Sequence, residues 1–285
     1  MTGEIEVVRA GALTMVQDLG RPGWAHLGVP RSGALDPGAL RLANRLVGNP
    51  ESAAGLEITL TGCVLRFHRA SAVALTGADA AVRVDERPGD VGRPLSVPAG
   101  AVLRVGAPRT GLRTWLAVGG GITVEPVLGS RSTDTLSGLG PPPLRDGDRL
   151  PVGPPAGPPA PVDATATPQA PGEVRLTVRL GPRADWFTES ARDLLLRGAY
   201  TVSPLSNRVG ARLTGAPLPR AVAGELPSEG IVLGAVQVPA DGQPLVFLAD
   251  HPTTGGYPVI GVVDDVTPLA QARPGTTVRF HGPQR

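Results

Sequence analysis

Glycine and proline interrupt this chain along its whole length, which limits the elements that it can form. There are 39 glycines and 32 prolines, together about a quarter of the 285 residues. Glycine destabilises helix and strand interiors and proline removes a backbone donor, so long regular elements are disfavoured. The composition borders on that of disordered chains, yet 41% of the residues are hydrophobic. We therefore expect a folded, turn-rich β protein with one large or two medium domains.

Short runs rich in valine and leucine recur between the glycines and prolines. They lie at 73–76, 81–84, 102–105, 114–118, 174–180, 200–202, 231–238, 245–249, 259–263 and 277–280. Such spacing is typical of barrels and sandwiches. Two helices are expected besides. One has Asp36 as its cap and Pro37 in its first turn and ends before Gly48. The other spans about Thr188 to Arg197, with Thr188 as its cap and Gly198 beyond its end. The sequence predicts a mainly β fold with few short helices.

One segment is almost uncharged and lacks hydrophobic patterning. Residues 151–172 are rich in proline, alanine and glycine, which favours an extended, semi-rigid spacer without a core of its own. We therefore predict an N-terminal β-rich domain at 1–150, a linker at 151–172 and a C-terminal β-barrel domain at 173–285.

The charged residues exclude several functions. The net charge is only +2, all 27 cationic residues are arginines, and they are scattered singly, so no nucleic-acid partner is expected. Without lysine the chain cannot carry covalent biotin, form a Schiff base or supply a phosphate-loop lysine. The single Cys63 excludes an internal disulfide. No apolar run is long enough for a membrane span, so we expect a cytoplasmic protein without a membrane partner.

Residues 16–37 concentrate polar side chains between glycines and prolines, as presented active-site loops do. The candidates there are Gln17, Asp18, Arg21, His26 and Ser32. Plainer interpretations are open for two of them. Asp18 is equally suited to capping a turn, and His26 to a hydrogen-bonded, half-buried position.

Three further clusters carry polar groups that suit chemistry. A segment at 129–134 has hydroxyls beside an arginine, and the segments 203–210 and 224–230 supply an arginine and two glutamates. The third cluster runs from Gln237 through 241–244 to Asp250 and His251 and ends in the segment 253–258, which reads Thr-Thr-Gly-Gly-Tyr-Pro. Successive backbone N–H groups beside hydroxyls suit an oxyanion or a phosphoryl oxygen. The last segment also suits a tight connection between strands, and the glutamates suit solvated loop positions. No carboxylate pair has metal-ligand spacing with histidine, so no metal site on this chain is predicted.

These motifs, in this order, resemble one protein family. The matching blocks are 16–23, 28–37, 43–44, 56–59, 75–79, 117–122, 128–133, 181–187, 228–230 and 253–258. They are similar to the KipA family, whose members are also known as the C component of 5-oxoprolinase, as allophanate hydrolase subunit 2 and as the biotin-dependent carboxyltransferase family. The resemblance covers nearly the whole chain outside the linker.

The resemblance implies a cyclophilin-like β-barrel architecture and two partners, the KipI-like B component of 5-oxoprolinase and its A component. The implied activity of the complex is the ATP-dependent opening of 5-oxoproline to L-glutamate, with ATP and Mg²⁺ required in the assembly. Phosphorylation of the amide oxygen makes the ring carbon of a lactam open to attack by water.

The implied site unites all four clusters. The catalytic candidates are Asp18, Arg21, Glu225 and Glu229; the substrate-binding candidates are Gln17, His26, Ser32, Arg131, Ser132, Arg208, Ser228, Thr253, Thr254, Gly255, Gly256 and Tyr257. The arginines at 21, 131 and 208 suit a substrate carboxylate, and the threonines suit phosphoryl oxygens. The acidic candidates suit Mg²⁺ binding or proton transfer.

Two alternative functions stay open. One is carboxyl transfer from biotin carried on another chain, as in urea carboxylase. Many relatives have lysine after Thr-Thr-Gly-Gly-Tyr-Pro, where this chain has Val259, so that mechanism does not transfer directly. The other is a non-catalytic protein that regulates a KipI-like kinase inhibitor. The neighbouring genes would separate these functions.

Overall fold

The chain forms two compact units. The structure is a computed structural model that describes residues 3–161, 165, 172–224 and 226–283. Of these, the first unit holds 3–21, 32–134, 138–161 and 165, and the second holds 22–31, 135–137, 172–224 and 226–283. The units differ from the expected domains, because 22–31 and 135–137 group with the second unit. Part of the expected linker, 162–164 and 166–171, lies outside the described residues.

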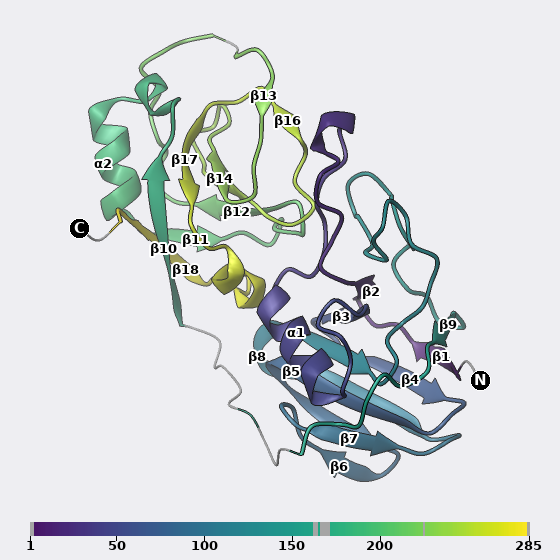
Figure 1. Ribbon diagram of the computed structural model, residues 1–285. Helices are drawn as coiled ribbons and strands as arrows, with labels where there is room; N and C mark the ends of the chain where they lie inside the picture. The colour runs from purple at the N-terminus through teal and green to yellow at the C-terminus, as the bar shows by residue number, and fades with distance from the viewer. Residues whose placement is uncertain (1–2, 162–164, 166–171, 225, 284–285) are drawn as a thin grey trace. The chain divides into compact units, whose positions relative to one another are not determined.

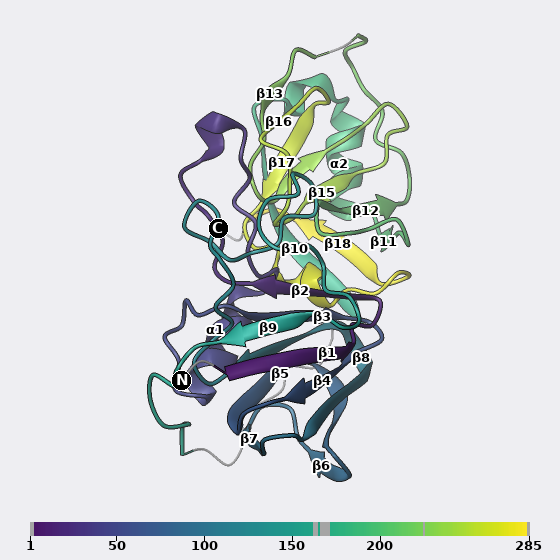
Figure 2. The ribbon, with the colours of Figure 1, turned by 90° about the vertical axis from the view of Figure 1, so that its right-hand side faces the viewer.

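A nine-stranded sheet builds the first unit (Figure 1). Its main path runs β2-β3-β8-β4-β1-β9, and β5 pairs with β6, β7 and β8. The strands are β1 (Gly3–Arg9), β2 (Leu13–Gln17), β3 (Gly55–Thr59), β4 (Cys63–Phe67), β5 (Ser71–Val84), β6 (Arg87–Gly89), β7 (Pro94–Val97), β8 (Val102–Val118) and β9 (Arg149–Val152). Figure 2 shows β9, β1 and β4 side by side, and both of these pairs are antiparallel.

Two long strands replace four short ones that the sequence predicts. The runs 73–76 and 81–84 join into β5, and 102–105 and 114–118 join into β8. The β5–β8 pairing shifts register between Gly77 and Val82, so the ladder bends without ending. Gly77 has a φ of 90°, and a Cβ there would lie 2.7 Å from the carbonyl oxygen of Arg113. A glycine that looks like a break in the sequence is therefore a bulge within a strand.

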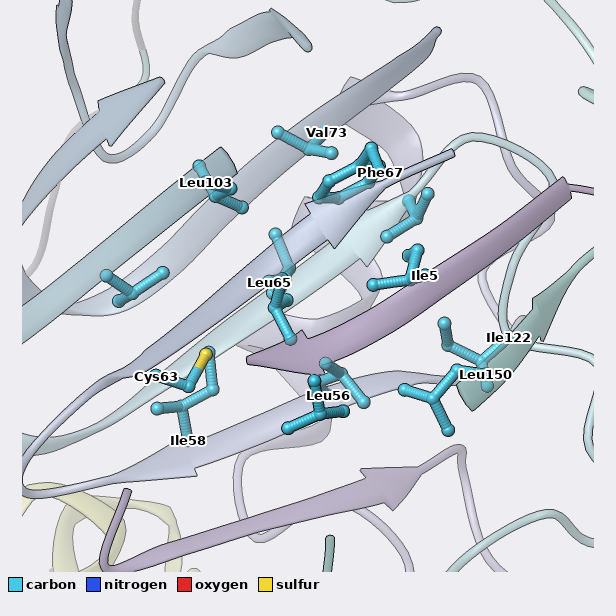
Figure 3. Close-up of a cluster of buried hydrophobic side chains, with 14 of the residues drawn as sticks. Ile5, Leu56, Ile58, Cys63, Leu65, Phe67, Val73, Leu103, Ile122 and Leu150 are labelled. Carbon is cyan, nitrogen blue, oxygen red and sulfur yellow. The ribbon is translucent and has the colours of Figure 1, made fainter. Parts of the chain in front are cut away.

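Hydrophobic side chains from this sheet form one core (Figure 3). Ile5, Leu56, Leu65, Phe67 and Leu103 are among its buried members. They alternate along their strands with residues on the other face of the sheet. Cys63 is also buried in this cluster.

Helix α1 (Pro37–Leu46) covers part of the same sheet. As predicted, Asp36 caps it, accepting a 2.8 Å hydrogen bond from the Ala39 N–H. Its buried residues Ala43 and Leu46 pack with Ala74 of β5 and Ala117 of β8. The first predicted helix is therefore confirmed, and it begins at the last residue of the 16–37 segment.

The second unit is a closed seven-stranded barrel with the strand order β10-β17-β14-β15-β12-β11-β18. These strands are β10 (Glu173–Leu180), β11 (Tyr200–Val202), β12 (Gly210–Thr214), β14 (Ala235–Gln237), β15 (Leu245–Phe247), β17 (Val259–Val263) and β18 (Thr277–His281). The β10–β18 pair is parallel, and the other pairs are antiparallel. Closure leaves no barrel edge open.

Helix α2 (Glu189–Arg197) belongs to the second unit and begins after Thr188, whose hydroxyl accepts from the Ala191 N–H, as predicted. A two-stranded sheet pairs β13 (Glu229–Gly230) with β16 (Thr254–Gly255). Short 3₁₀ helices lie at η1 (Ala25–Leu27), η2 (Ala184–Trp186) and η3 (Thr267–Gln271). The mainly β fold class is confirmed, with two α-helices among the described residues. The predicted 231–238 strand was too long: its β14 part starts after Gly234, whose φ is 81°.

Candidate functional site

Asp18 is a buried carboxylate held by four donors. Its Oδ1 accepts from the Gly20 N–H at 2.8 Å and from the hydroxyls of Ser130 and Ser132 at 2.6 Å each, and its Oδ2 accepts from the Arg131 N–H at 2.7 Å. The contact two residues along the chain is the turn-capping geometry that the sequence left open. Asp18 also ties strand β2 to the 130–132 segment. These contacts show Asp18 bound to protein groups and do not test a catalytic role, which stays a prediction.

Arg21 is also buried, with 1% of its surface exposed. Its Nη1 donates to the Ser32 hydroxyl at 3.0 Å, and Nη2 donates to the Ser132 carbonyl oxygen. The Ser32 hydroxyl in turn donates to Oδ2 of Asp134 at 2.8 Å. We call Asp18, Arg21, Ser32, Ser132 and Asp134 the buried polar network. It brings together four predicted site residues and adds Asp134.

Backbone strain accompanies this network. Ser32 has a φ of 54° and Leu128 a φ of 51°, both in the left-handed region. That conformation costs about 1–3 kcal/mol for a residue other than glycine, so the surroundings must enforce it. Arg21 contacts the backbone next to Leu128, because its Nε donates to the Val127 carbonyl oxygen at 3.3 Å.

Gln17 and Arg131 lie beside the buried polar network. The Gln17 Nε2 donates to the Thr133 carbonyl oxygen at 2.9 Å, while the Gln17 Oε1 and the Thr133 Oγ1 are buried and have no hydrogen-bond partner among the described residues. The Nε of Arg131 donates to the Val124 carbonyl oxygen at 2.8 Å.

The 253–257 turn in the second unit presents the Thr-Thr-Gly-Gly-Tyr motif. In the β13–β16 pair, Glu229 lies opposite Gly255 and Gly230 opposite Thr254. The Ile231 N–H donates to the Thr253 carbonyl oxygen at 2.9 Å, which extends the pairing by one residue. The structure therefore joins two predicted clusters, 224–230 and 253–258. Ser228 directly precedes β13 and is exposed, and Glu225 lies outside the described residues.

Part of the 16–37 segment lies beside the 253–257 turn within the second unit. A Cβ at Gly28 would lie 4.0 Å from the Thr253 hydroxyl oxygen. His26 is exposed, which corrects the half-buried interpretation. Its Nδ1 lies 3.1 Å from the Gly23 carbonyl oxygen, and its ring stacks on Trp24. The 3₁₀ helix that contains His26, η1, has no buried residue, so it gives the ring no core to enter.

Glu229 is paired with Arg183. The Arg183 Nε lies 2.9 Å from Oε1 and 3.0 Å from Oε2 of Glu229, and Nη2 makes a further contact with Oε1. The hydrogen bonds from Arg183 lower the pKa of Glu229, and those to Glu229 raise the pKa of Arg183. Glu229 is therefore a poor proton acceptor at neutral pH.

Arg208 is buried and pairs with Asp250. Its Nε and Nη2 each lie 2.9 Å from one carboxylate oxygen of Asp250. Asp250 Oδ2 also accepts from the Thr135 hydroxyl at 2.7 Å and from the Thr135 N–H at 3.0 Å. Asp250 lies in the polar cluster that the sequence analysis found before the 253–258 segment, but it was not among the residues selected for the site. Its place three residues before Thr253 is the signal that could have selected it.

Glu57 is another buried carboxylate that the sequence did not select. It accepts from the Leu35 N–H at 2.9 Å and from the Trp115 indole N–H at 3.2 Å, and it lies 3.5 Å from Nε of Arg113. It therefore fixes the segment that leads into α1. An acidic residue inside an apolar strand run marks such a group.

Neither a metal cluster nor a membrane-spanning helix is present in the described part of the chain. Among the described residues, no group of three or more histidines, cysteines, aspartates or glutamates is placed to hold a metal ion. No described helix is both long enough and apolar enough to span a membrane.

A two-unit β architecture with these motifs defines a class of protein. The family model "Carboxyltransferase domain, subdomain A and B" matches residues 27–282, and the chain belongs to this family. The chain is 41% identical over 281 residues to the C component of the 5-oxoprolinase of Escherichia coli (strain K12), covering 97% of this chain and 90% of the relative. The family resemblance seen in the sequence motifs is therefore confirmed.

Two solved structures are similar to nearly the whole chain. TTHA0988 has a TM-score of 0.89 and 38% identity, covering 98% of this chain and 55% of that one. The Kluyveromyces lactis urea amidolyase has a TM-score of 0.90 and 30% identity, covering 99% of this chain and 19% of that one. The chain thus spans about half of TTHA0988 and a fifth of the amidolyase.

Proposed function

We propose that this chain is the C component of an ATP-dependent 5-oxoprolinase that opens 5-oxoproline to L-glutamate. The observation that carries the proposal is the 41% identity to the C component of the E. coli 5-oxoprolinase, over 97% of this chain and 90% of that one. A protein named as one component of an enzyme works with others. We therefore propose a KipI-like B component and an A component as the partners, in the cytoplasm.

The proposed chemistry activates a poor electrophile. The γ-phosphoryl group of ATP passes to the amide oxygen of the lactam, and ADP leaves. Water then adds to the ring carbon, the carbon–nitrogen bond breaks and the nitrogen takes up a proton, which leaves an acyl phosphate on the opened chain. A second water hydrolyses this acyl phosphate and phosphate is released. The products are glutamate, ADP and phosphate.

The 253–257 turn is the part of this chain that we propose to bind the reacting oxygens. Thr254 is exposed and Thr253 partly exposed, and the turn is held on β13 by paired backbone groups. Hydroxyls and N–H groups fixed in this way stabilise developing negative charge without reorganising. Gly255 and Gly256 let the backbone approach a ligand closely.

Two of the acidic candidates for Mg²⁺ binding are engaged by protein groups. The carboxylate of Asp18 accepts from four protein donors, and that of Glu229 is paired with Arg183. We propose that MgATP is bound mainly by the companion proteins. No catalytic step of this chain is assigned to the metal.

The test is reconstitution. The chain is co-purified with its companion proteins, and glutamate is measured from 5-oxoproline with MgATP. We expect stoichiometric glutamate and ADP that depend on every component and on ATP. A correctly assembled complex that releases no glutamate would overturn the proposal.

A second candidate is a carboxyltransferase component that uses biotin on another chain. The K. lactis urea amidolyase match, with 30% identity over 99% of this chain, favours it. This chain contains no lysine to carry biotin, so the carrier must be separate. Carboxylation of urea, dependent on bicarbonate, ATP and an added biotin carrier, would support this candidate over lactam opening.

A further inference from the structure

Two of the arginines expected to bind a substrate carboxylate already have protein partners. Arg21 and Arg208 are each 1% exposed, the first within the buried polar network and the second on Asp250. Arg208 is the one of these arginines that belongs to the second unit. Within that unit, a carboxylate bound at the 253–257 turn therefore calls for a cation other than Arg208.

Arg220 lies at that turn, and its backbone is tightly placed. It forms an isolated β-bridge with Phe187. On either side, the Thr188 N–H donates to the Pro219 carbonyl oxygen at 3.3 Å, and the Ala221 N–H donates to the Trp186 carbonyl oxygen at 2.8 Å. The end of the 181–187 motif thus holds the backbone of Arg220 in place.

The guanidinium of Arg220 stacks over Tyr257. Its Cζ lies 5.9 Å from the ring centroid, and its Nη2 donates to the Val238 carbonyl oxygen at 2.7 Å. Its Nε is buried and has no partner among the described residues, and no described residue accepts from Nη1. Because Nε is buried, the donors left for a ligand are those of Nη1 and Nη2. They lie in the plane of the guanidinium, which suits a planar carboxylate.

The turn and Arg220 are anchored to the same short stretch of chain. The Gln237 Nε2 donates to the Tyr257 carbonyl oxygen, and the Val238 N–H donates to the Pro258 carbonyl oxygen, both at 3.1 Å. Val238 therefore bonds to both the arginine and the turn. The spacing between the guanidinium and the motif is set by hydrogen bonds on both sides.

Arg220 also differs from Arg183, the other arginine beside this turn, in charge balance. Arg183 is neutralised by Glu229, whereas no described carboxylate forms an ion pair with Arg220. Tyr257 is 48% exposed, so the stack lies at the protein surface. A cation that is rigidly held and not neutralised, beside two threonine hydroxyls, favours an anionic ligand.

We propose that Arg220, stacked on Tyr257, binds the carboxylate of the lactam substrate while the 253–257 turn binds its reacting oxygens. The proposal rests on the proposed function and extends it to the substrate class, a lactam that carries a carboxylate. The single positive charge of the guanidinium balances the single negative charge of such a substrate.

The test uses the reconstituted complex with Arg220→Ala and Arg220→Lys. We expect Arg220→Ala to raise the KM for 5-oxoproline by about 10- to 100-fold, the effect of losing charge-assisted hydrogen bonds, with the KM for ATP unchanged. Arg220→Lys keeps the charge without the planar fork and should recover part of the loss. The matched control is Arg212→Ala, an exposed arginine of the same unit, which should match the wild type.

A second arm uses 2-pyrrolidinone, the same ring without the carboxylate. The wild type should prefer 5-oxoproline strongly, and Arg220→Ala should lose most of that preference. An unchanged KM for 5-oxoproline in an assembled Arg220→Ala complex would overturn the proposal. A raised KM for ATP alone would assign Arg220 to phosphate and would also overturn it.

The two proposals fail in different ways. A wild-type complex that opens no lactam refutes the proposed function, and the role of Arg220 with it. A wild-type complex that is active and indifferent to both Arg220 variants refutes only the role of Arg220. Assembly of the complex and melting temperature are measured for each variant, and Arg220→Lys decides the question if Arg220→Ala does not fold.

Discussion

The buried polar network of the first unit and the 253–257 turn of the second contain similar residue types in opposite surroundings. In the network, Asp18 and Arg21 are buried, and protein groups contact their charged atoms. At the turn, Thr254 and Tyr257 are exposed, and no described residue accepts from Nη1 of Arg220. Charges that are paired inside the protein stabilise its fold, whereas polar groups that stay free at the surface are available to a ligand.

The largest expected effect is the loss of stability on removing Arg21. Arg21 donates to the Ser32 hydroxyl, which donates to the buried carboxylate of Asp134, so Arg21→Ala removes the positive charge from this chain of hydrogen bonds. We expect the free energy of unfolding to fall by about 3–5 kcal/mol. Urea denaturation of the isolated chain measures it. The matched control Arg104→Ala removes an exposed arginine of the same sheet and should change stability by less than about 0.5 kcal/mol.

The distinction between a structural network in the first unit and a ligand-binding turn in the second is wrong if Arg21→Ala unfolds like the wild type and its complex makes no glutamate. That pair of results would return Arg21 to the catalytic role that the sequence predicts. A destabilised variant whose assembled complex still opens the lactam would confirm a bracing role.

A smaller effect is expected for the partly exposed Arg183–Glu229 pair. Glu229→Gln, Arg183→Ala and the double variant should each shift the midpoint of urea unfolding only slightly, because solvent screens the pair. If Glu229 only positions the turn, the three variants lose similar activity, and exchanging the two residues restores some of it. A catalytic Glu229 predicts that Glu229→Gln alone is much the worst and that the exchange rescues nothing.

The same pair has a defined pH dependence. Arg183 lowers the pKa of Glu229 in the folded protein, so the stabilisation is fully present above the ordinary glutamate pKa of about 4.3. It is lost as the pH falls below that value through the lower folded pKa. Unfolding measured from about pH 6 to about pH 3 should show this loss in the wild type and not in Glu229→Gln.

The smallest expected effect concerns Cys63. Burial raises the pKa of its thiol to about 12, so almost no thiolate forms at about pH 8. A thiol reagent should leave the native chain unmodified and modify one thiol per chain in denaturant. Rapid modification of the native chain would show that the core of the first unit opens readily.

Local chemistry made several features predictable. The Asp36 and Thr188 caps and both helices follow from side chains that bond to the backbone a few residues away. The mainly β class follows from short aliphatic runs between turn residues. The joining of runs into β5 and β8 was not predictable, because a glycine bulge and a strand end have the same local sequence.

The sequence identified the types of the candidate residues, but not whether their side chains are buried, exposed or paired. The sequence selected Arg21, Arg131 and Arg208 as cations, yet it could not show that the first and last are buried on protein partners. Arg220 was not selected, because its partners Phe187, Val238 and Tyr257 stand 18 to 37 positions away. Nothing in the residues next to it marks its role.

The sequence by itself determined the family, the β class and the helix caps, because these depend on residue order and on contacts between near neighbours. The tertiary structure alone decided which charges are neutralised and which are available. Asp250 neutralises Arg208 over 42 positions and Glu229 neutralises Arg183 over 46, while Arg220 has no described carboxylate opposite it. Electrostatic pairing depends on distance in space, and only the fold sets that distance.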